Sequence, residues 1–239
     1  MIRSVVVQDF HVPFQDKRVV ELLIGFLKKE KPDRLYLNGD IHDFYQVSQF
    51  AKDPARLDTF QKEINECKSL LCALKKTCNP EIHYIQGNHE KRLQKFLWKK
   101  SPQLACLDSL QVPSLLGLND LGIKYHKKGV NLGDLYITHG SIVRKHAGYT
   151  AKAEFEKNGC SGISGHTHRD GKYSVRNRSG SFAWWENYCV CELDAEYIDG
   201  IANWSQGWSM VTTIGKRPYV EQVCVLGDKY IYNGNVRSK

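Results

Sequence analysis

The first half of the chain alternates short apolar runs with longer segments whose apolar positions recur every three or four residues. Residues 2–7 are rich in β-branched side chains and are typical of a buried strand. The apolar positions of residues 19–27 form one helical stripe, and those of residues 57–74 form another. Two further apolar runs, residues 34–37 and 81–85, predict strands on either side of the second helix.

The second half of the chain is dominated by predicted strands. These are expected over residues 135–137, the residues before Gly165, and residues 188–193, 209–214 and 219–225. Alternating strands and helices followed by strands predict an α/β sandwich. Because no linker, repeat or low-complexity stretch interrupts the pattern, residues 1–239 are expected to form a single domain.

Polar residues of metal-binding types follow several of the predicted strands directly. They are Asp9, Asp40, Asn88, His139 and His166. In open α/β sheets, ligands bind outside the carboxyl ends of the strands. Five separate segments are therefore expected to deliver these side chains to one edge of the fold.

Each of these segments alone has an ordinary structural explanation. A lone Asp-x-His is usually a turn, and residues 87–90 could be a helix entry with Asn88 as its N-cap. Five such segments in one chain, each at a strand end, are unlikely to coincide by chance. As they stand, the motifs are Asp9-Phe10-His11, Gly39-Asp40-Ile41-His42-Asp43, Gly87-Asn88-His89-Glu90, Thr138-His139-Gly140 and Gly165-His166-Thr167-His168.

The order of these motifs resembles the calcineurin-like metallophosphoesterase superfamily, whose signature runs DxH, GDxxD, GNH(D/E), H and GHxH. The match spans residues 9–168, and the compact, basic chain is similar to small stand-alone members of bacterial or phage type. The resemblance implies an α/β fold, a four-layer α-β-β-α sandwich of two mixed β-sheets flanked by helices. It also implies two divalent transition metal ions at the edge of the sheets.

The resemblance implies a role for each ligand position. Asp9, His11 and His168 would hold the first metal, Asn88, His139 and His166 the second, and Asp40 would bridge the two. Imidazole, carboxylate and amide ligands together suit Mn²⁺, Fe or Zn²⁺ better than Ca²⁺ or Mg²⁺, and Mn²⁺ is the first expectation.

The implied reaction is hydrolysis of a phosphate ester by a metal-bridging hydroxide. The charges agree, because two divalent ions face only two ligand carboxylates, Asp9 and Asp40, and leave the site positive for phosphate. By the same resemblance His89 would be the general acid that protonates the leaving oxygen. Asp43 would orient the His89 ring, with a helix-start cap as the alternative.

The residues directly after the second motif narrow the choice of substrate. In serine/threonine protein phosphatases an arginine follows the last aspartate, whereas here Asp43 is followed by Phe44. The ending at His168 looks instead like the phosphodiesterase and nuclease branches. A phosphodiester of a nucleic acid or nucleotide is therefore expected, with a phosphomonoester of a protein or metabolite as the alternative and a non-catalytic metal-binding scaffold as the third hypothesis. Candidate substrate contacts are Arg92, Arg144 and Arg169.

Charge and composition add further expectations. The 34 Lys and Arg against 26 Asp and Glu give a net charge of +8, which suits a polyanionic substrate or serves solubility alone. Lys91, Arg92, Lys95 and Lys99 along one predicted helix are interpreted either as a solvated helix face or as a track for backbone phosphates. Trp184, Trp185, Trp204 and Trp208 are interpreted as packing of the second sheet, with base stacking as the alternative. Eight cysteines without a CxxC pair, and no apolar run of membrane length, predict a cytoplasmic protein with reduced thiols and no membrane partner.

Overall fold

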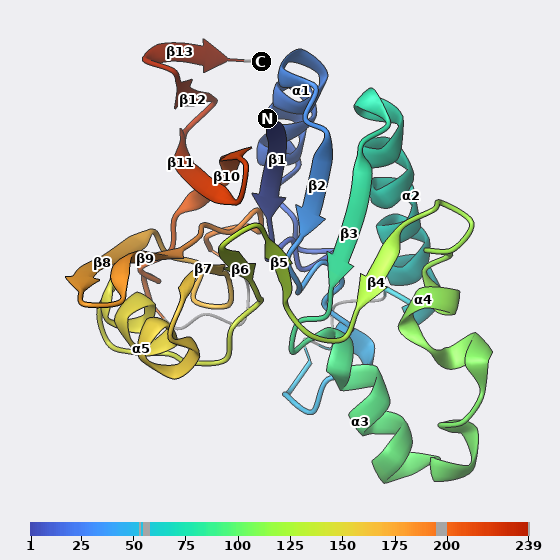
Figure 1. Ribbon diagram of the computed structural model, residues 1–239. Helices are drawn as coiled ribbons and strands as arrows, with labels where there is room; N and C mark the ends of the chain where they lie inside the picture. The colour runs from blue at the N-terminus through green and yellow to red at the C-terminus, as the bar shows by residue number, and fades with distance from the viewer. Residues whose placement is uncertain (53, 55–57, 195–199, 239) are drawn as a thin grey trace.

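Two mixed β-sheets pack face to face in the computed structural model, which describes residues 1–52, 54, 58–194 and 200–238 (Figure 1). The larger sheet has eight strands in the order β13-β12-β11-β10-β1-β2-β3-β4. The smaller sheet has five strands in the order β5-β6-β7-β9-β8. All eight cysteines lie among the described residues and are free thiols.

The elements follow one another along the chain as strands with interspersed helices. The strands are β1 (Ile2–Val7), β2 (Arg34–Leu37), β3 (Glu81–Ile85), β4 (Lys124–His126), β5 (Val130–Leu132), β6 (Leu135–Ile137), β7 (Ser161–Ser164), β8 (Gly171–Asn177), β9 (Gly180–Glu186), β10 (Gln206–Ile214), β11 (Arg217–Leu226), β12 (Lys229–Tyr232) and β13 (Asn235–Ser238). The helices are α1 (Lys17–Glu30), α2 (Phe60–Cys78), α3 (Glu90–Lys100), α4 (Val112–Leu115) and α5 (Tyr149–Asn158).

The centre of the larger sheet is parallel, because α1 and α2 return the chain to the same edge each time. β1 pairs with β2, β2 with β3, and β3 with β4 in parallel, while β10 pairs antiparallel with the other side of β1. The carboxyl ends of β1, β2 and β3 therefore lie together at one edge. In the smaller sheet, β6 and β7 are also parallel, and the loops that follow them reach the same region.

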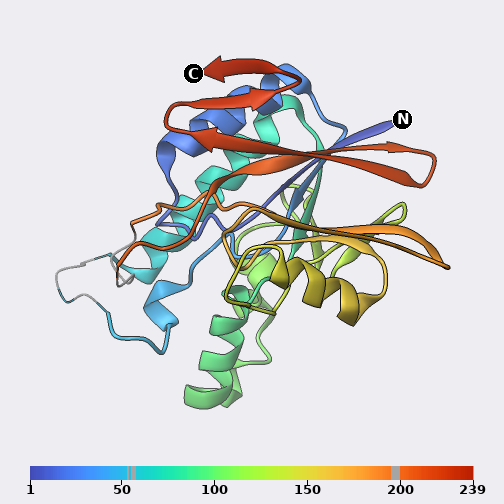
Figure 2. The ribbon, with the colours of Figure 1, turned by 90° about the vertical axis from the view of Figure 1, so that its left-hand side faces the viewer.

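Two apolar cores separate four layers. The apolar stripes of α1 and α2 pack on one face of the larger sheet, where Phe26 and Leu71 are fully buried. Between the two sheets, Val6 of β1 packs with Ile137 of β6 and Ile163 of β7. Helix α5 covers the outer face of the smaller sheet, against β8 and β9 (Figure 2). The predicted four-layer α-β-β-α sandwich of two mixed sheets is confirmed.

One predicted strand is absent from the structure, and the predicted start of one helix falls outside the described residues. Helix α2 begins at Phe60, where the Thr59 hydroxyl accepts a hydrogen bond from the Lys62 backbone; the predicted start at Leu57 lies outside the described residues. Residues 188–193 form no strand, and the prediction of one was wrong. This segment crosses beneath the loop that follows β1, where the Val190 backbone donates to the Asp9 carbonyl at 3.0 Å, so its apolar side chains are buried without joining a ladder.

No helix within the described part of the chain combines the length and the apolar character needed to cross a bilayer.

Candidate metal centre

Five loops at the carboxyl ends of β1, β2, β3, β6 and β7 bring the predicted ligands together. Several of these residues adopt a left-handed backbone, with φ near +50° to +71°. They are Asp9, His11, Asp40, His166 and His168. Asp, Asn and His are the non-glycine residues enriched in this region of φ/ψ space. Each loop can therefore turn sharply off its strand while still carrying a polar side chain toward the centre.

The first cluster contains one carboxylate and two imidazoles. Asp9 is fully buried, and its Oδ2 accepts a hydrogen bond from the His166 backbone at 3.0 Å. Its Oδ1 has no hydrogen-bond partner, although it lies 3.4 Å from Nε2 of His168 and 3.7 Å from Nε2 of His11. A buried carboxylate oxygen without a partner is costly. Asp9 Oδ1 and the two Nε2 atoms lie within 4.8 Å of one another, so one cation could be bound by all three.

The second cluster lies beside the first and contains Asp40. Oδ2 of Asp40 is 3.2 Å from Nε2 of His139, and the same nitrogen is 3.0 Å from Oδ1 of Asn88. Asp40, His139 and His166 form a group whose ligand atoms again lie within 4.8 Å of one another. Oδ2 of Asp40 is also 4.0 Å from Nε2 of His11. This oxygen therefore lies between the two clusters.

Hydrogen bonds to Nδ1 of His139 and His11 orient these two rings so that Nε2 faces the centre. Nδ1 of His139 lies 2.9 Å from the Asn38 carbonyl, which can only accept, so this nitrogen carries the proton. Nδ1 of His11 lies 3.1 Å from Oδ2 of Asp43. Both rings therefore direct Nε2 at the centre, and this nitrogen could bind a cation that displaces any proton on it.

The charges in the centre are strongly coupled. Burial opposes ionisation of Asp40, but the neighbouring imidazoles of His139 and His89 outweigh it and hold the pKa of Asp40 well below its usual range. Burial likewise favours a neutral His139 ring, yet the Asp40 carboxylate raises the pKa of His139 to about 9. The pKa of His166 is lowered, chiefly by burial. The centre is an anionic pocket whose negative charge is compensated by protons on histidine, as expected where a cation could replace those protons.

Glu90 joins two of the ligand loops, a role that the sequence analysis missed. Its Oε2 accepts hydrogen bonds from the backbones of Asp40 at 3.0 Å and Gly87 at 2.7 Å. Its Oε1 accepts from the Ile41 backbone at 2.9 Å and from the Tyr84 hydroxyl at 2.7 Å. The buried carboxylate thereby fixes the loop after β2 against the loop after β3. In the sequence, only the position of Glu90 at the end of the motif Gly87-Asn88-His89-Glu90 pointed to this role.

Gly87 is required by the same arrangement. A Cβ at this position would lie 2.1 Å from Oδ1 of Asp40 and 2.5 Å from its backbone nitrogen, which no side chain can do without displacing the ligand loop.

His89 lies at the mouth of the centre together with Asp43 and Arg92. Its Nδ1 is 3.0 Å from Oδ2 of Asp43, and its Nε2 is 3.6 Å from Oδ2 of Asp40. The Arg92 guanidinium reaches Oδ1 of Asp43 at 2.7 Å and Nε2 of His89 at 2.9 Å. Because a guanidinium only donates, Nε2 of His89 accepts here and its proton is on Nδ1, facing Asp43. Asp43 therefore contacts both His89 and His11.

A cavity of about 780 Å³ opens over the two clusters. Described residues that line it include His11, Asp40, Asn88, His89 and His166, together with Arg92, Tyr45, Phe50 and Trp204. Of the three predicted substrate arginines, only Arg92 is among them. The Arg169 guanidinium instead donates to the carbonyls of Arg144 and Lys145, at 2.8 and 3.4 Å.

Of the four tryptophans, Trp185 is partly buried against the core between the two sheets, and the other three lie in the cores or at the cavity. Trp184 is fully buried in the smaller sheet, as interpreted from the sequence, but Trp208 is buried in the core beneath α1. Trp204 packs its ring on His168, with the centroids 4.1 Å apart.

Comparison with known proteins identifies the family. The profile of the calcineurin-like phosphoesterases matches residues 2–202, most of the chain. The chain belongs to the calcineurin-like phosphoesterase family. Over 98% of both lengths it is 26% identical to the gene 54 protein of Mycobacterium phage L5 and 26% identical to the gene 54 protein of Mycobacterium phage D29.

Solved structures show the same fold. Vps29 of Chaetomium thermophilum is similar with a TM-score of 0.51 and 9% identity, over 100% of this chain and 93% of that protein. Vps29 of Entamoeba histolytica complexed with Zn²⁺ has a TM-score of 0.50 and 12% identity, over 100% and 97%. A dimetal phosphatase from Danio rerio has a TM-score of 0.50 and 10% identity, over 92% and 95%.

The family implies divalent metal ions, and the described residues include several groups of side chains suited to them, the two clusters above among them. The unpartnered Oδ1 of Asp9 and the paired Nε2 atoms of His11 and His168 fit the requirements of such an ion.

Proposed function

We propose that this chain is a dinuclear metal-dependent phosphodiesterase whose substrate is a nucleic acid or a nucleotide. The observation that carries this proposal is the position of Asp40 Oδ2, within 4.0 Å of ligand nitrogens in both clusters. Asp9, His11 and His168 are assigned to the first ion, Asn88, His139 and His166 to the second, and Asp40 to both. Two such ions supply a nucleophilic water near neutral pH and neutralise charge on phosphate oxygens. Mn²⁺, Fe²⁺ and Zn²⁺ all suit this ligand set.

His89 is assigned as the general acid, held in place by Asp43. It lies at the edge of the centre, and its Nδ1–H donates to a carboxylate that also fixes His11. In the structure its Nε2 accepts from Arg92, so it cannot donate there until the guanidinium moves. A phosphate group binding over the centre would attract Arg92 and release Nε2. Once Nε2 takes up a second proton from solvent, the ring could transfer that proton to the leaving oxygen while Nδ1–H stays on Asp43.

The shape of the cavity supports a substrate with an aromatic group beside the phosphate. Tyr45, Phe50 and Trp204 line it beyond the ligand residues. Its volume of about 780 Å³ exceeds that of a phosphate alone and is in the range of pockets that bind nucleotide-sized ligands. A base can stack on exposed aromatic rings, which stabilises binding by about 1–3 kcal/mol per base.

The test compares hydrolysis of bis-p-nitrophenyl phosphate and p-nitrophenyl phosphate by protein reconstituted with Mn²⁺. We expect faster hydrolysis of the diester. A second screen should then find activity on single-stranded DNA, RNA or cyclic nucleotides. Arg92→Gln should raise KM, because it removes a cation from the cavity. Arg169→Gln is the matched control, since that guanidinium binds backbone carbonyls and does not line the cavity.

The other outcomes each select a different function. Preferential hydrolysis of the monoester would favour a phosphomonoesterase acting on a phosphoprotein or a small metabolite. No turnover of either ester with Mn²⁺, Fe²⁺ or Zn²⁺ would refute the proposal and favour a metal-binding scaffold.

A further inference from the structure

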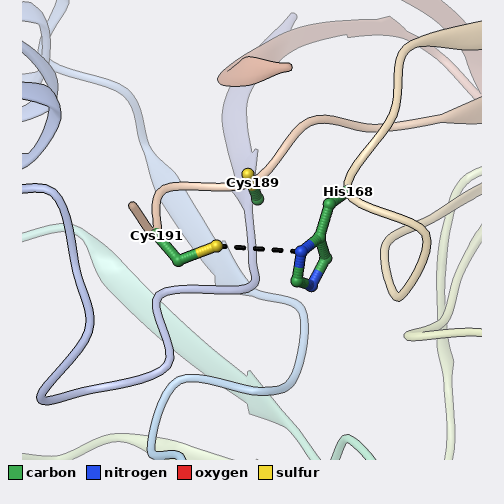
Figure 3. Close-up of side chains that lie close together, drawn as sticks. All are labelled: His168, Cys189 and Cys191. Atoms are coloured by element: carbon green, nitrogen blue, oxygen red, sulfur yellow. Dashed lines mark hydrogen bonds between the residues drawn. The ribbon is translucent and has the colours of Figure 1, made fainter. Parts of the chain in front are cut away.

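Two cysteines lie directly behind the proposed first metal position. Cys189 and Cys191 are fully buried on the segment that crosses beneath the β1 loop, and His168 is nearly so. The two sulfurs and an imidazole nitrogen of His168 lie within 4.8 Å of one another. Figure 3 shows the Cys191 sulfur directed at the His168 ring, with Cys189 beside it. Nothing in the proposed reaction uses either thiol.

His168 has two different environments on its two nitrogens. Nε2 faces the first cluster, 3.4 Å from Oδ1 of Asp9. Nδ1 points the opposite way and lies 3.7 Å from Sγ of Cys191. A neutral imidazole has one unprotonated nitrogen at a time, so it can bind a metal on either side but not on both.

The geometry fits a tetrahedral ion bound by sulfur. With bonds of about 2.3 Å to sulfur and 2.05 Å to nitrogen, a tetrahedral ion holds those two ligands about 3.6 Å apart. The observed separation of Cys191 Sγ and His168 Nδ1 is 3.7 Å. A disulfide between Cys189 and Cys191 fits less well. In extended backbone, the Cα atoms of residues i and i+2 are about 6.6 Å apart, which is near the upper limit of the Cα–Cα distance that a disulfide spans.

We propose that Cys189, Cys191 and Nδ1 of His168 form a separate site for a thiophilic metal ion such as Zn²⁺, Cd²⁺ or Cu⁺. Thiolate and imidazole are the ligands that select these ions over Mn²⁺ or Mg²⁺. Two thiolates neutralise a divalent ion, so the occupied site carries no net charge into its buried surroundings. His168 also lines the cavity, which gives the ion a route from solvent.

Occupation of this site would inhibit the enzyme, a consequence that rests on the proposed function. An ion on Nδ1 places the remaining proton of the His168 ring on Nε2. The first cluster then loses one of its ligands, and Asp9 and His11 must hold the catalytic ion with less support.

The experiment titrates metal-free protein with Cd²⁺ and follows the ultraviolet thiolate-to-metal charge-transfer absorption, without substrate. We expect an absorption that saturates at one Cd²⁺ per chain, is abolished in the double variant Cys189→Ser/Cys191→Ser and is retained in Cys106→Ser, whose thiol is exposed and distant in sequence. X-ray absorption at the cadmium edge of the wild-type complex should find two sulfur neighbours. This measurement holds even if the double variant folds poorly.

The link to activity is measured separately. In the presence of Mn²⁺ and a phosphodiester, the Cd²⁺ concentration for half-inhibition should rise about 10-fold or more in the double variant. Equal charge-transfer absorption in wild type and double variant, or a wild-type cadmium site without sulfur, would overturn the proposal and leave Cys191 as a thiol that only orients His168. An inactive enzyme that still binds Cd²⁺ through sulfur would refute the proposed function and leave this site intact.

Discussion

Replacement of Glu90 by Gln should destabilise the protein by about 2–4 kcal/mol. The carboxylate accepts from four backbone N–H groups and the Tyr84 hydroxyl, whereas a carboxamide has one accepting oxygen and one donating nitrogen. The Tyr84 hydroxyl can rotate to accept from that nitrogen, but the backbone N–H of Ile41 then has no acceptor, and the long 3.4 Å bond from the His42 backbone is lost as well.

The magnitude comes from counting these bonds. Leaving one buried N–H unpaired costs about 1–3 kcal/mol. The other three bonds each weaken by about 1 kcal/mol when their partner loses its charge. Part of this loss is offset, because burial and the neighbouring Asp40 carboxylate raise the pKa of Glu90, so its ionised form is itself unfavourable.

The assay is urea unfolding of metal-free protein, followed by the fluorescence of buried tryptophans, in a chelator that removes stabilisation by bound ions. Tyr84→Phe should cost less than Glu90→Gln, since it removes one of the five hydrogen bonds. Glu156→Gln is the control: its side chain on α5 is 60% exposed, and we expect a change within about 0.5 kcal/mol. A loss below about 1 kcal/mol in Glu90→Gln would show that Glu90 does not hold the two loops together.

Three further predictions address metal, catalysis and pH. Elemental analysis should find nearly two metal ions per chain after Mn²⁺ loading, with a larger loss in Asp40→Asn than in Asp9→Asn, because Asp40 contacts both clusters. His89→Ala should lower turnover by about 10²-fold or more and leave the metal content unchanged; a lost ion would mean that His89 is a ligand. Burial lowers the pKa of His83 to about 4, so the unfolded chain binds a proton that the folded protein does not as the pH falls from about 6.5 toward 4. The free energy of unfolding should therefore contain a loss of about 1–2 kcal/mol between pH 7 and pH 5 that His83→Gln lacks; equal pH dependence in both would contradict it.

Prediction from sequence succeeded where a single local signal decides the structure. The β-branched residues of β1 and the helical stripe of α1 required no knowledge of distant contacts. Strand β8 was missed because its residues alternate between half-buried and exposed positions and carry little apolar character. Residues 188–193 were predicted as a strand because the run is largely apolar. Its side chains are indeed buried, but the segment packs beneath a loop and forms only isolated bridges.

The same distinction applies to the metal centre. Its motif residues could be read from the chain, since each follows a recognisable strand. The residues that position them could not. Glu90 contacts Asp40 across fifty residues, and Asn38 contacts His139 across 101. Arg144 and Arg169 were named because they adjoin motifs, but nearness in sequence did not bring them into the cavity.

The left-handed backbone of the ligand loops limits how these positions can be substituted. Of the nine non-glycine residues with positive φ in the described part of the chain, five are the proposed ligands Asp9, His11, Asp40, His166 and His168. Alanine at any of them would remove a ligand and also introduce a residue disfavoured in that conformation, at a cost of about 1 kcal/mol. An alanine scan of the centre would thus confuse folding with metal binding. Replacement by glycine or asparagine keeps the turn and isolates the effect on metal coordination. Sequence variation at these positions should be confined to the few residue types that both adopt a left-handed backbone and bind the ion.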